Sequence, residues 1–234
     1  MKTKKAGALS LASILTMAAL GSVLAQDIQY SDFLSDYTQL QRSSDEYLHY
    51  IYLPPGVENR MVSYSAVMID QPEFVLAADS AYKGMKPGDL MDLADTFRAA
   101  VTEVLAETYL IVDRPGPNVL LLRPALTNLQ LKKPRRKLLG YTPVGLARGA
   151  VRSRRSDLMN KIDLRGLTIE MEVLDSNTEE QLAAIVEIRS GTEEAPASWE
   201  ELDALLGVYS QRLGCRLDNA RVAVEVRVDC LSDL

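Results

Sequence analysis

The sequence predicts an α+β domain in two layers, an antiparallel or mixed sheet with two main helices packed on one face. Residues 89–107 and 198–213 carry apolar side chains at the i, i+3, i+4, i+7 spacing of amphipathic helices. Shorter runs of β-branched and apolar residues, several alternating with period two, predict strands. They cover residues 63–70, 110–113, 119–131, 167–174, 182–189 and 221–229. Each apolar stripe and sheet face must be buried, so these elements favour one helical layer against one sheet.

Both helices have recognisable ends. Asp89 is an N-cap residue for the first helix. Ser198 and Glu201 form a capping box at the start of the second helix, and Gly214 is expected to end it.

The strands are bounded by turn residues. Residues 47–53 predict a short strand before a Pro-Pro-Gly turn, and the 119–131 strand is expected to break or bulge at Pro124. Residues 175–178 (DSNT) have turn chemistry, which makes the strands on either side a predicted hairpin.

Two acidic residues share one face of the 167–174 strand. Alternation places Ile169, Met171 and Val173 on a buried face, and Glu170 and Glu172 on a face expected to be solvated. Two neighbouring carboxylates could form an acid–base pair. Cross-strand charge pairing is the favoured interpretation, with arginines on neighbouring strands as the partners. These arginines are Arg189, Arg221 and Arg227.

Residues 1–25 are expected to be a secretory signal peptide. Three lysines precede an uncharged stretch that ends in Val23-Leu24-Ala25, a pattern typical of a cleavage site after Ala25. A retained membrane anchor is the alternative. No cysteine lies near Ala25 to carry a lipid anchor, so the expected location is the periplasm. Cleavage removes three lysines and no acid, so the net charge of −6 becomes −9.

The exported chain divides into an N-terminal arm and one domain. The arm, residues 26–60, is rich in tyrosine and either offers a binding surface or packs over the domain, which is the favoured interpretation. Residues 61–234 form a single α+β domain with a basic insert at 132–161. Cys215 and Cys230 are the only cysteines, and export favours a disulfide between them over free thiols or a redox pair. Its loop closure is worth roughly 3 kcal/mol in the chain-entropy model.

The familiar signatures of enzymes are missing from the sequence. The single histidine, His49, lies among aromatic residues without a nucleophile motif nearby. We find no zinc spacing, no dinucleotide-binding glycine motif and no P-loop. We therefore expect a protein that is not an enzyme, with no catalytic, cofactor-binding or metal-binding residues. The acidic net charge also argues against general binding to nucleic acid.

One short segment reverses this acidic balance. Residues 132–155 hold nine basic residues and no acid, while the rest of the exported chain carries a net −18. The basic residues are Lys132, Lys133, Arg135, Arg136, Lys137, Arg148, Arg152, Arg154 and Arg155. Either the acidic body neutralises the segment, or the segment contacts an anionic membrane surface or an acidic envelope protein.

Five blocks of the sequence carry a family resemblance. They are FLSDYTQL at 33–40, the strand at 67–70, YLIVDRPGPNVLLLRPALT at 109–127, YTPVGLARGA at 141–150 and EVLDSNTEEQLAA at 172–184. Together they resemble the DUF3313 family, a bacterial family of exported proteins without an assigned function. The resemblance implies a Gram-negative cell envelope and helices packed against a sheet. It implies no catalytic residues.

Taken together, these features predict an exported cell-envelope protein that acts as a non-enzymatic binding or assembly module. Its basic segment would contact an anionic envelope component. The alternatives are a carboxylate-based envelope hydrolase and a structural subunit of an oligomeric envelope complex.

Overall fold

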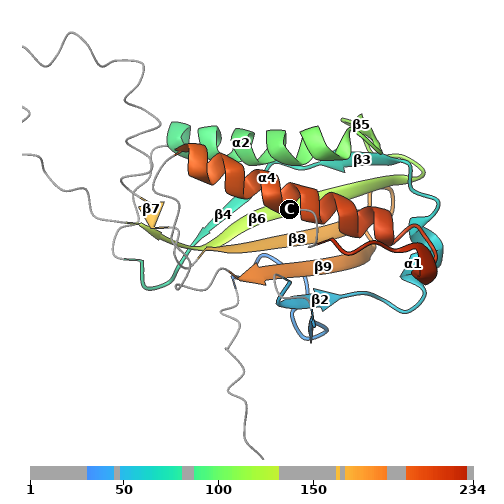
Figure 1. The fold of residues 1–234 in the computed structure, drawn as a ribbon. Coiled ribbons are helices and arrows are strands. Elements are labelled where there is room, and N and C mark those ends of the chain that lie inside the picture. The colour runs from blue at the N-terminus through green and yellow to red at the C-terminus, as the bar shows by residue number, and fades with distance from the viewer. Residues whose placement is uncertain are drawn as a thin grey trace, which may run out of the picture.

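The protein folds as a mixed sheet with two long helices on one face, which confirms the predicted α+β class (Figure 1). The computed structural model describes residues 31–44, 48–80, 87–131, 162–163, 167–188 and 199–230. The strands are β1 (Gln41–Arg42), β2 (Tyr50–Tyr52), β3 (Ala66–Ile69), β4 (Glu73–Leu76), β5 (Leu110–Val112), β6 (Val119–Leu131), β7 (Ile162–Asp163), β8 (Thr168–Asp175) and β9 (Gln181–Ile188). The helices are α1 (Val57–Met61), α2 (Pro87–Leu105), α4 (Trp199–Asn219) and the 3-10 helix η2 (Val224–Val226).

The sheet has an antiparallel half and a parallel half. Its order is β1-β2-β9-β8-β6-β3-β5, with β4 and β7 also paired to β6. The pairs from β1 to β6 are antiparallel, whereas β3 runs parallel to both β5 and β6. The predicted hairpin is β8 and β9, and β6 and β8 form the middle of the sheet.

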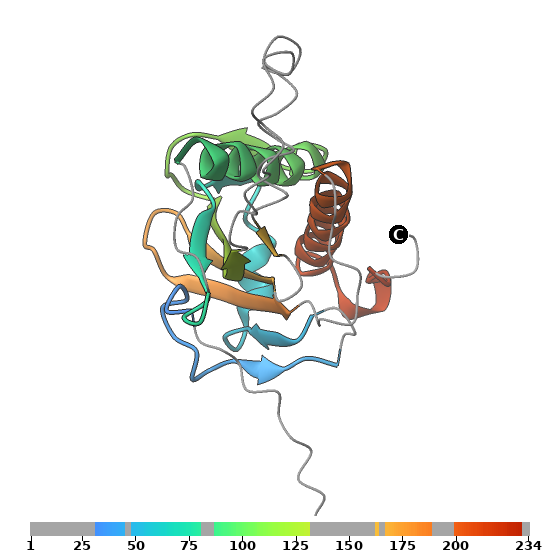
Figure 2. The same ribbon diagram turned by 90° about the vertical axis from the view of Figure 1, so that its left-hand side faces the viewer.

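The main core lies between this sheet and the helix pair. Figures 1 and 2 show α2 and α4 side by side on the same face of the sheet. The Phe97 ring of α2 meets the Tyr209 ring of α4 edge to face, with centroids 5.7 Å apart. Buried side chains of β8, including Met171, complete this cluster. The helical layer predicted from the sequence is therefore present.

The helix ends differ from the predicted ones. α2 begins at Pro87, before the expected cap Asp89, because proline is well accommodated in the first turn of a helix. α4 runs past the predicted stop at Gly214 and ends at Asn219. A Cβ at Gly214 would lie only 2.8 Å from Cγ1 of Val104 on α2, so this glycine serves the close approach of two helices.

β6 also continues where the sequence predicted a break. Pro124 lies opposite Met171 of β8 within an unbroken ladder. On the other edge, β6 pairs with β3 up to Leu122 and with β4 from Ala125, so Pro124 falls between the two partners. Its missing N–H therefore removes no hydrogen bond from either pairing. The ladder between β4 and β6 shifts further along, near Asn128, which has φ 55°.

The β8–β9 turn has the predicted chemistry. The Oδ1 atom of Asp175 accepts hydrogen bonds from the amides of Asn177 and Thr178, each at 2.9 Å. Its Oδ2 atom accepts from the Tyr64 hydroxyl at 2.6 Å. Burial acts to raise the pKa of Asp175, but these hydrogen bonds outweigh it and hold the pKa below its usual value.

The first part of the N-terminal arm, residues 31–40, packs against the sheet face opposite the helices, at the lower left of Figure 2. Phe33 and Leu34 are buried in a second apolar cluster with Ala125, Ala184 and Val186. The strand expected within residues 47–53 is β2, which pairs with β9. The arm thus adds a partial third layer to the two that the sequence predicted.

The predicted C-terminal strand, residues 221–229, does not form. The described part of the segment contains η2, flanked by extended residues, and pairs with no strand of the described sheet. The predicted disulfide is present between Cys215 of α4 and Cys230, with a Cα–Cα distance of 5.6 Å. Asn219 also bonds the backbone N and O of Val228, at 3.0 and 2.8 Å. These links hold the segment at the end of α4, away from the sheet.

Candidate functional site

The candidate site is a layer of buried polar side chains between β8 and the N-terminal arm. Alternation along β8 turns Glu170 and Glu172 away from the helices, and their exposed fractions are only 1% and 0%. A buried carboxylate is stable only when hydrogen bonds or a cation compensate for lost hydration. The partners of the two carboxylates therefore define what this layer does.

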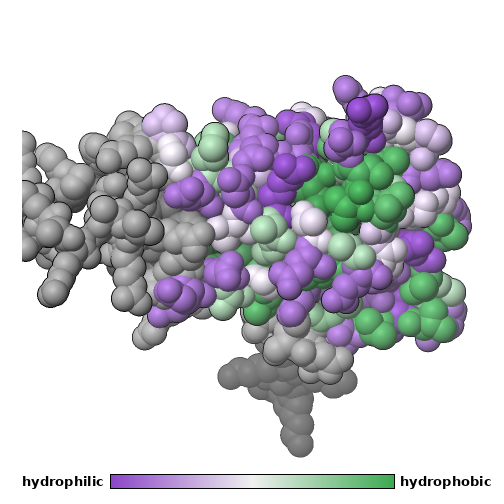
Figure 3. Space-filling view, turned by 90° about the horizontal axis from the view of Figure 1, so that it is seen from above, coloured by the Kyte–Doolittle hydropathy of each residue, from purple (hydrophilic) through white to green (hydrophobic). Residues whose placement is uncertain are grey.

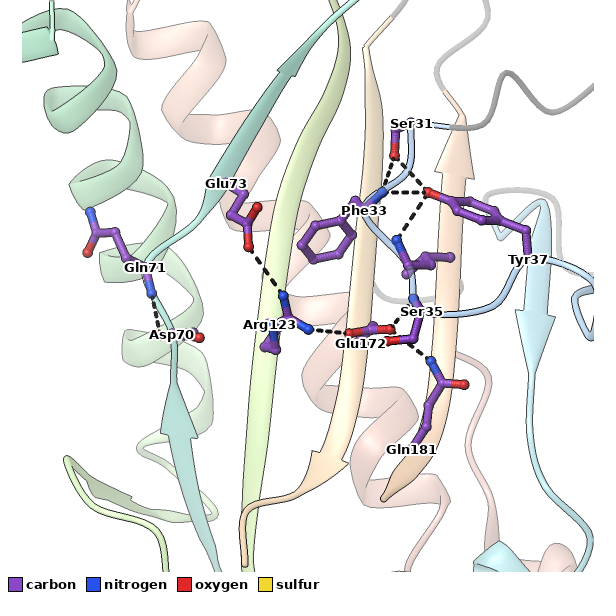
Figure 4. A network of polar contacts seen from close by, with 11 residues as sticks. Ser31, Phe33, Ser35, Tyr37, Asp70, Gln71, Glu73, Arg123, Glu172 and Gln181 are labelled. Atoms are coloured by element: carbon purple, nitrogen blue, oxygen red, sulfur yellow. Dashed lines mark hydrogen bonds and ion pairs between the residues drawn. The ribbon is translucent and has the colours of Figure 1, made fainter. Parts of the chain in front are cut away.

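The Glu172 carboxylate accepts hydrogen bonds from an arginine side chain, a backbone N–H and a glutamine side chain (Figure 4). Arg123 lies directly opposite it on β6, and Nη1 of Arg123 donates to Oε2 of Glu172 at 2.7 Å. The Oε1 atom accepts from the backbone N–H of Ser35 at 2.7 Å and from Nε2 of Gln181 at 3.0 Å. The Ser35 contact ties the arm to the middle of the sheet.

The Arg123 guanidinium joins three parts of the fold. Besides Glu172, it contacts Glu73 of β4, with Nη2 3.3 Å from Oε1. Its Cζ atom also lies 5.5 Å from the centroid of the Phe33 ring in the arm, a cation–π distance. Figure 4 shows Phe33 above this guanidinium.

Glu170 is held by two hydroxyl groups. The Tyr37 hydroxyl donates to Oε2 and the Thr127 hydroxyl to Oε1, each at 2.5 Å. The Tyr37 oxygen in turn accepts from the amides of Phe33 and Leu34, each at 3.2 Å. Burial, and then the bond to Glu170, raise the pKa of Tyr37 above its usual value. Tyr37 therefore stays protonated at neutral pH and remains a hydrogen-bond donor.

This arrangement can clamp the arm onto the sheet. All four oxygens of Glu170 and Glu172 accept hydrogen bonds, and the arm supplies two of the donors, from Ser35 and Tyr37. Acid–base chemistry at these carboxylates would require the arm to move away. The two glutamates are thus placed as anchors for the arm.

Cross-strand charge pairing is present at Glu172, but its partner is Arg123, and two of the three expected arginines, Arg221 and Arg227, were wrong. Arg221 lies over the Tyr109 ring, with Cζ 4.9 Å from the centroid, and Arg227 donates to the backbone O of Val222. Arg189 lies outside the described residues. The face predicted to be solvated is covered by the arm. Arg123, inside an apolar run, was the residue of the sequence that could have indicated this buried ion pair.

A second buried ion cluster lies on the helix face of the sheet. Glu187 of β9 pairs with Arg212 of α4, and Nη1 of Arg216 lies 3.7 Å from its Oε2. The side chains of Glu187 and Arg212 are both almost fully buried. Sequence reasoning missed this cluster. The signal was an acid in phase with the core residues Ala183 and Ile185.

His49 has a role at the edge of the sheet. Its Nδ1 atom accepts a hydrogen bond from the backbone N–H of Ile188 at 3.1 Å, and its own amide donates to Val186 O. Both bonds link the arm to β9, so the histidine helps to extend the sheet towards β2.

The basic segment lies outside the described residues, as do residues 1–25 and Ser198. The structure does describe the strands on either side of the 132–161 insert. β6 ends at Leu131, and β7 pairs with it in antiparallel register, Gln130 opposite Asp163 and Leu131 opposite Ile162. Leu131 and Ile162, the described residues that flank the 132–161 insert, are therefore paired in one ladder.

The described residues lack two kinds of feature. Among them no group of three or more His, Cys, Asp or Glu side chains could hold a metal ion. In the same part of the chain, no helix has the length and apolar character needed to cross a membrane.

Comparison with known proteins identifies the family without giving an activity. No curated protein matches the chain. The sequence profile described as "Protein of unknown function (DUF3313)" matches residues 29–213, from the arm to α4. This match covers most of the 234 residues and includes the arm, the sheet and the helix pair. The chain therefore belongs to the DUF3313 family.

Proposed function

We propose that this DUF3313 protein is exported to the cell envelope and works by binding rather than by turnover. In this proposal, the basic segment, residues 132–155, contacts the phosphate groups of an anionic membrane surface. The N-terminal pattern of three lysines, an uncharged stretch and small residues before position 26 supports export. Nine basic residues flanking an apolar stretch at 138–147 support interfacial binding.

The observation that carries the proposal is the pairing of β6 with β7. This ladder pairs Leu131 with Ile162, the described residues on either side of the 132–161 insert, so both of these residues lie at one end of the sheet. Figure 1 shows β7 at the left-hand end of β6. Repulsion among so many like charges favours an external anion as their partner.

Several acids of the body are already paired within it. Glu172 binds Arg123, Glu187 binds Arg212, and Glu180 binds Arg60. These carboxylates are therefore engaged by cations of the body. The arm also covers Glu170 and Glu172, the two neighbouring carboxylates that the sequence offered as a possible acid–base pair, which supports binding over turnover at this position.

Vesicle binding tests the proposal. The exported protein should sediment with vesicles that contain phosphatidylglycerol but not with vesicles of phosphatidylcholine alone, and added salt should weaken the binding. Each basic residue near an anionic membrane contributes about 1 kcal/mol. Replacing Arg152, Arg154 and Arg155 by Gln should therefore lower the partition coefficient by about 100-fold.

A matched control variant removes the same number of charges from the body. Arg42, Arg98 and Arg114 are exposed, and their replacement by Gln should leave vesicle binding nearly unchanged. Equal losses in both variants would show that only net charge matters. Equal binding to both kinds of vesicle, or unchanged binding of the Arg152, Arg154 and Arg155 variant, would overturn the proposal.

A further inference from the structure

The C-terminal segment carries an alternating apolar pattern that the fold leaves exposed. Val222, Val224, Val226 and Val228 have exposed fractions of 41%, 68%, 63% and 65%. Alternation of valine with polar residues is typical of a β-strand that is hydrogen-bonded to a neighbouring strand. The segment is displayed beside the end of α4, and Figure 3 shows hydrophobic surface at this end of the molecule. The apolar side chains are therefore available to a partner.

We propose that the C-terminal segments of two copies of this chain pair as antiparallel strands about a two-fold axis at Val226. In this register Val226 faces its own copy, and Val224 of each chain faces Val228 of the other. Valine pairs of this kind stabilise antiparallel strands. An interface that uses the same patch on both copies is the usual form of a homodimer.

Charge complementarity favours a second copy of this chain as the partner of the C-terminal segment. The same register places Glu225 of each chain opposite Arg227 of the other, which gives two reciprocal ion pairs. Neighbouring registers lose this match, because an axis at Glu225 places two glutamates face to face. Within the described residues, Glu225 forms no ion pair, whereas Arg227 contacts only the backbone O of Val222.

The backbone of the segment fits this pairing. Asn219 bonds both the N–H and the C=O of Val228, so these groups point towards α4. In an extended chain, the backbone N–H and C=O groups of Glu225 and Arg227 then point to the opposite side, away from α4. In the proposed register, these backbone groups form hydrogen bonds between Glu225 of one chain and Arg227 of the other. The segment thus presents to a second copy the edge that the register needs.

Only one turn has to open. η2 is held by hydrogen bonds from Val226 N to Ala223 O at 3.1 Å and from Arg227 N to Val224 O at 3.3 Å. Ala223 and Arg227 already have extended backbones, with ψ values of 150° and 140°. The disulfide holds the segment at the end of α4 throughout, which reduces the conformational entropy lost on association.

A charge-swap experiment tests the proposal on the exported, oxidised protein. Sedimentation velocity should show association of the unaltered chain as its concentration rises towards about 1 mM, as expected for a small interface. Glu225→Arg and Arg227→Glu should each weaken self-association about tenfold or more, because both reciprocal pairs become repulsive. An equimolar mixture of the two variants should recover association, since both pairs are attractive in the mixed dimer.

The control is Met91→Ser, which removes another exposed hydrophobic side chain, 62% exposed on α2. It should leave association unchanged. A chain that stays monomeric up to this concentration would overturn the proposal. Single variants that associate as well as the unaltered chain, or a mixture that fails to recover association, would also overturn it.

Discussion

The contact between Gly214 of α4 and Val104 of α2 gives a sharp test of the helix packing. A glycine inside a helix costs about 1 kcal/mol relative to alanine. Gly207 lies in the same helix with open space around it, so Gly207→Ala should stabilise the protein by about that amount. At Gly214 the new methyl would lie 2.8 Å from Cγ1 of Val104, far inside the usual carbon–carbon contact of about 3.5–4.0 Å.

The cost at Gly214 comes from overpacking. Valine has a stiff χ1 and cannot swing its methyl aside as a long side chain would, so the helices must shift. Overpacking of this kind costs about 1–3 kcal/mol, against the gain of about 1 kcal/mol from helix propensity. We therefore expect Gly214→Ala to be neutral or to destabilise by up to about 2 kcal/mol. It should be less stable than Gly207→Ala by about 1–3 kcal/mol.

Urea unfolding followed by circular dichroism measures this difference. A change of 1 kcal/mol should also move the melting temperature by about 2–4 °C in a chain of this size. Adding Val104→Ala to Gly214→Ala should remove the clash and give a favourable coupling energy of about 1–3 kcal/mol in a double-mutant cycle. If Gly214→Ala stabilises as much as Gly207→Ala, the close approach of α2 and α4 is refuted.

Three further outcomes follow from the buried polar layer, the turn and the disulfide. Tyr37→Phe leaves one oxygen of buried Glu170 without its donor and should lower the free energy of unfolding by about 1–3 kcal/mol; a change below about 0.5 kcal/mol would contradict the clamp. Burial acts to raise the pKa of Asp175, but hydrogen bonds from Tyr64 and the turn outweigh burial, so the folded pKa lies below the unfolded pKa. The ionised carboxylate therefore stabilises the fold at neutral pH, and this stabilisation is lost as the pH falls through the folded pKa. Asp175→Asn should therefore flatten the acid limb of the pH–stability profile, and an unchanged limb would contradict this. Cys215→Ser should lower the free energy of unfolding by about 1 kcal/mol or less, below the roughly 3 kcal/mol of the chain-entropy model, because the released residues 221–229 bury little surface. Limited proteolysis of this variant should cut residues 221–229 first, and first cleavage elsewhere would contradict this.

The elements that could be predicted from the sequence have strong local periodicity. α2 and α4 each bury one face against the sheet, so spacing alone indicates both the helix and its buried side. The β8–β9 hairpin was predicted from its apolar runs and its turn, although both faces of these strands are buried. Their ends were less predictable, because tertiary contacts decide them. Gly214 looks like a helix stop from the sequence, yet its role is to admit the side chain of Val104.

The polar layer could be predicted only in part, because its partners are distant in sequence. The alternation of β8 gives Glu170 and Glu172 a common face, but their arm partner Ser35 is 137 residues away from Glu172. A glutamate that alternates with apolar residues in a strand is predicted to face solvent, unless the segment that covers that face of the sheet is known. The apolar residues Phe33 and Leu34 of the arm were the sign that some surface had to receive it.

The C-terminal segment shows the opposite case, in which the strand pattern is clear but the strand is missing. Alternation reports that a segment is suited to pairing, and it does not say with which edge. Cys215 and Asn219 hold the segment at the end of α4, so the edges of its own sheet are not its partners. Exposure of such a segment favours association with other chains, because an unpaired strand leaves its backbone N–H and C=O groups free to pair with another strand. The self-complementary order of Glu225 and Arg227 is what turns a general tendency to associate into a specific register between two copies.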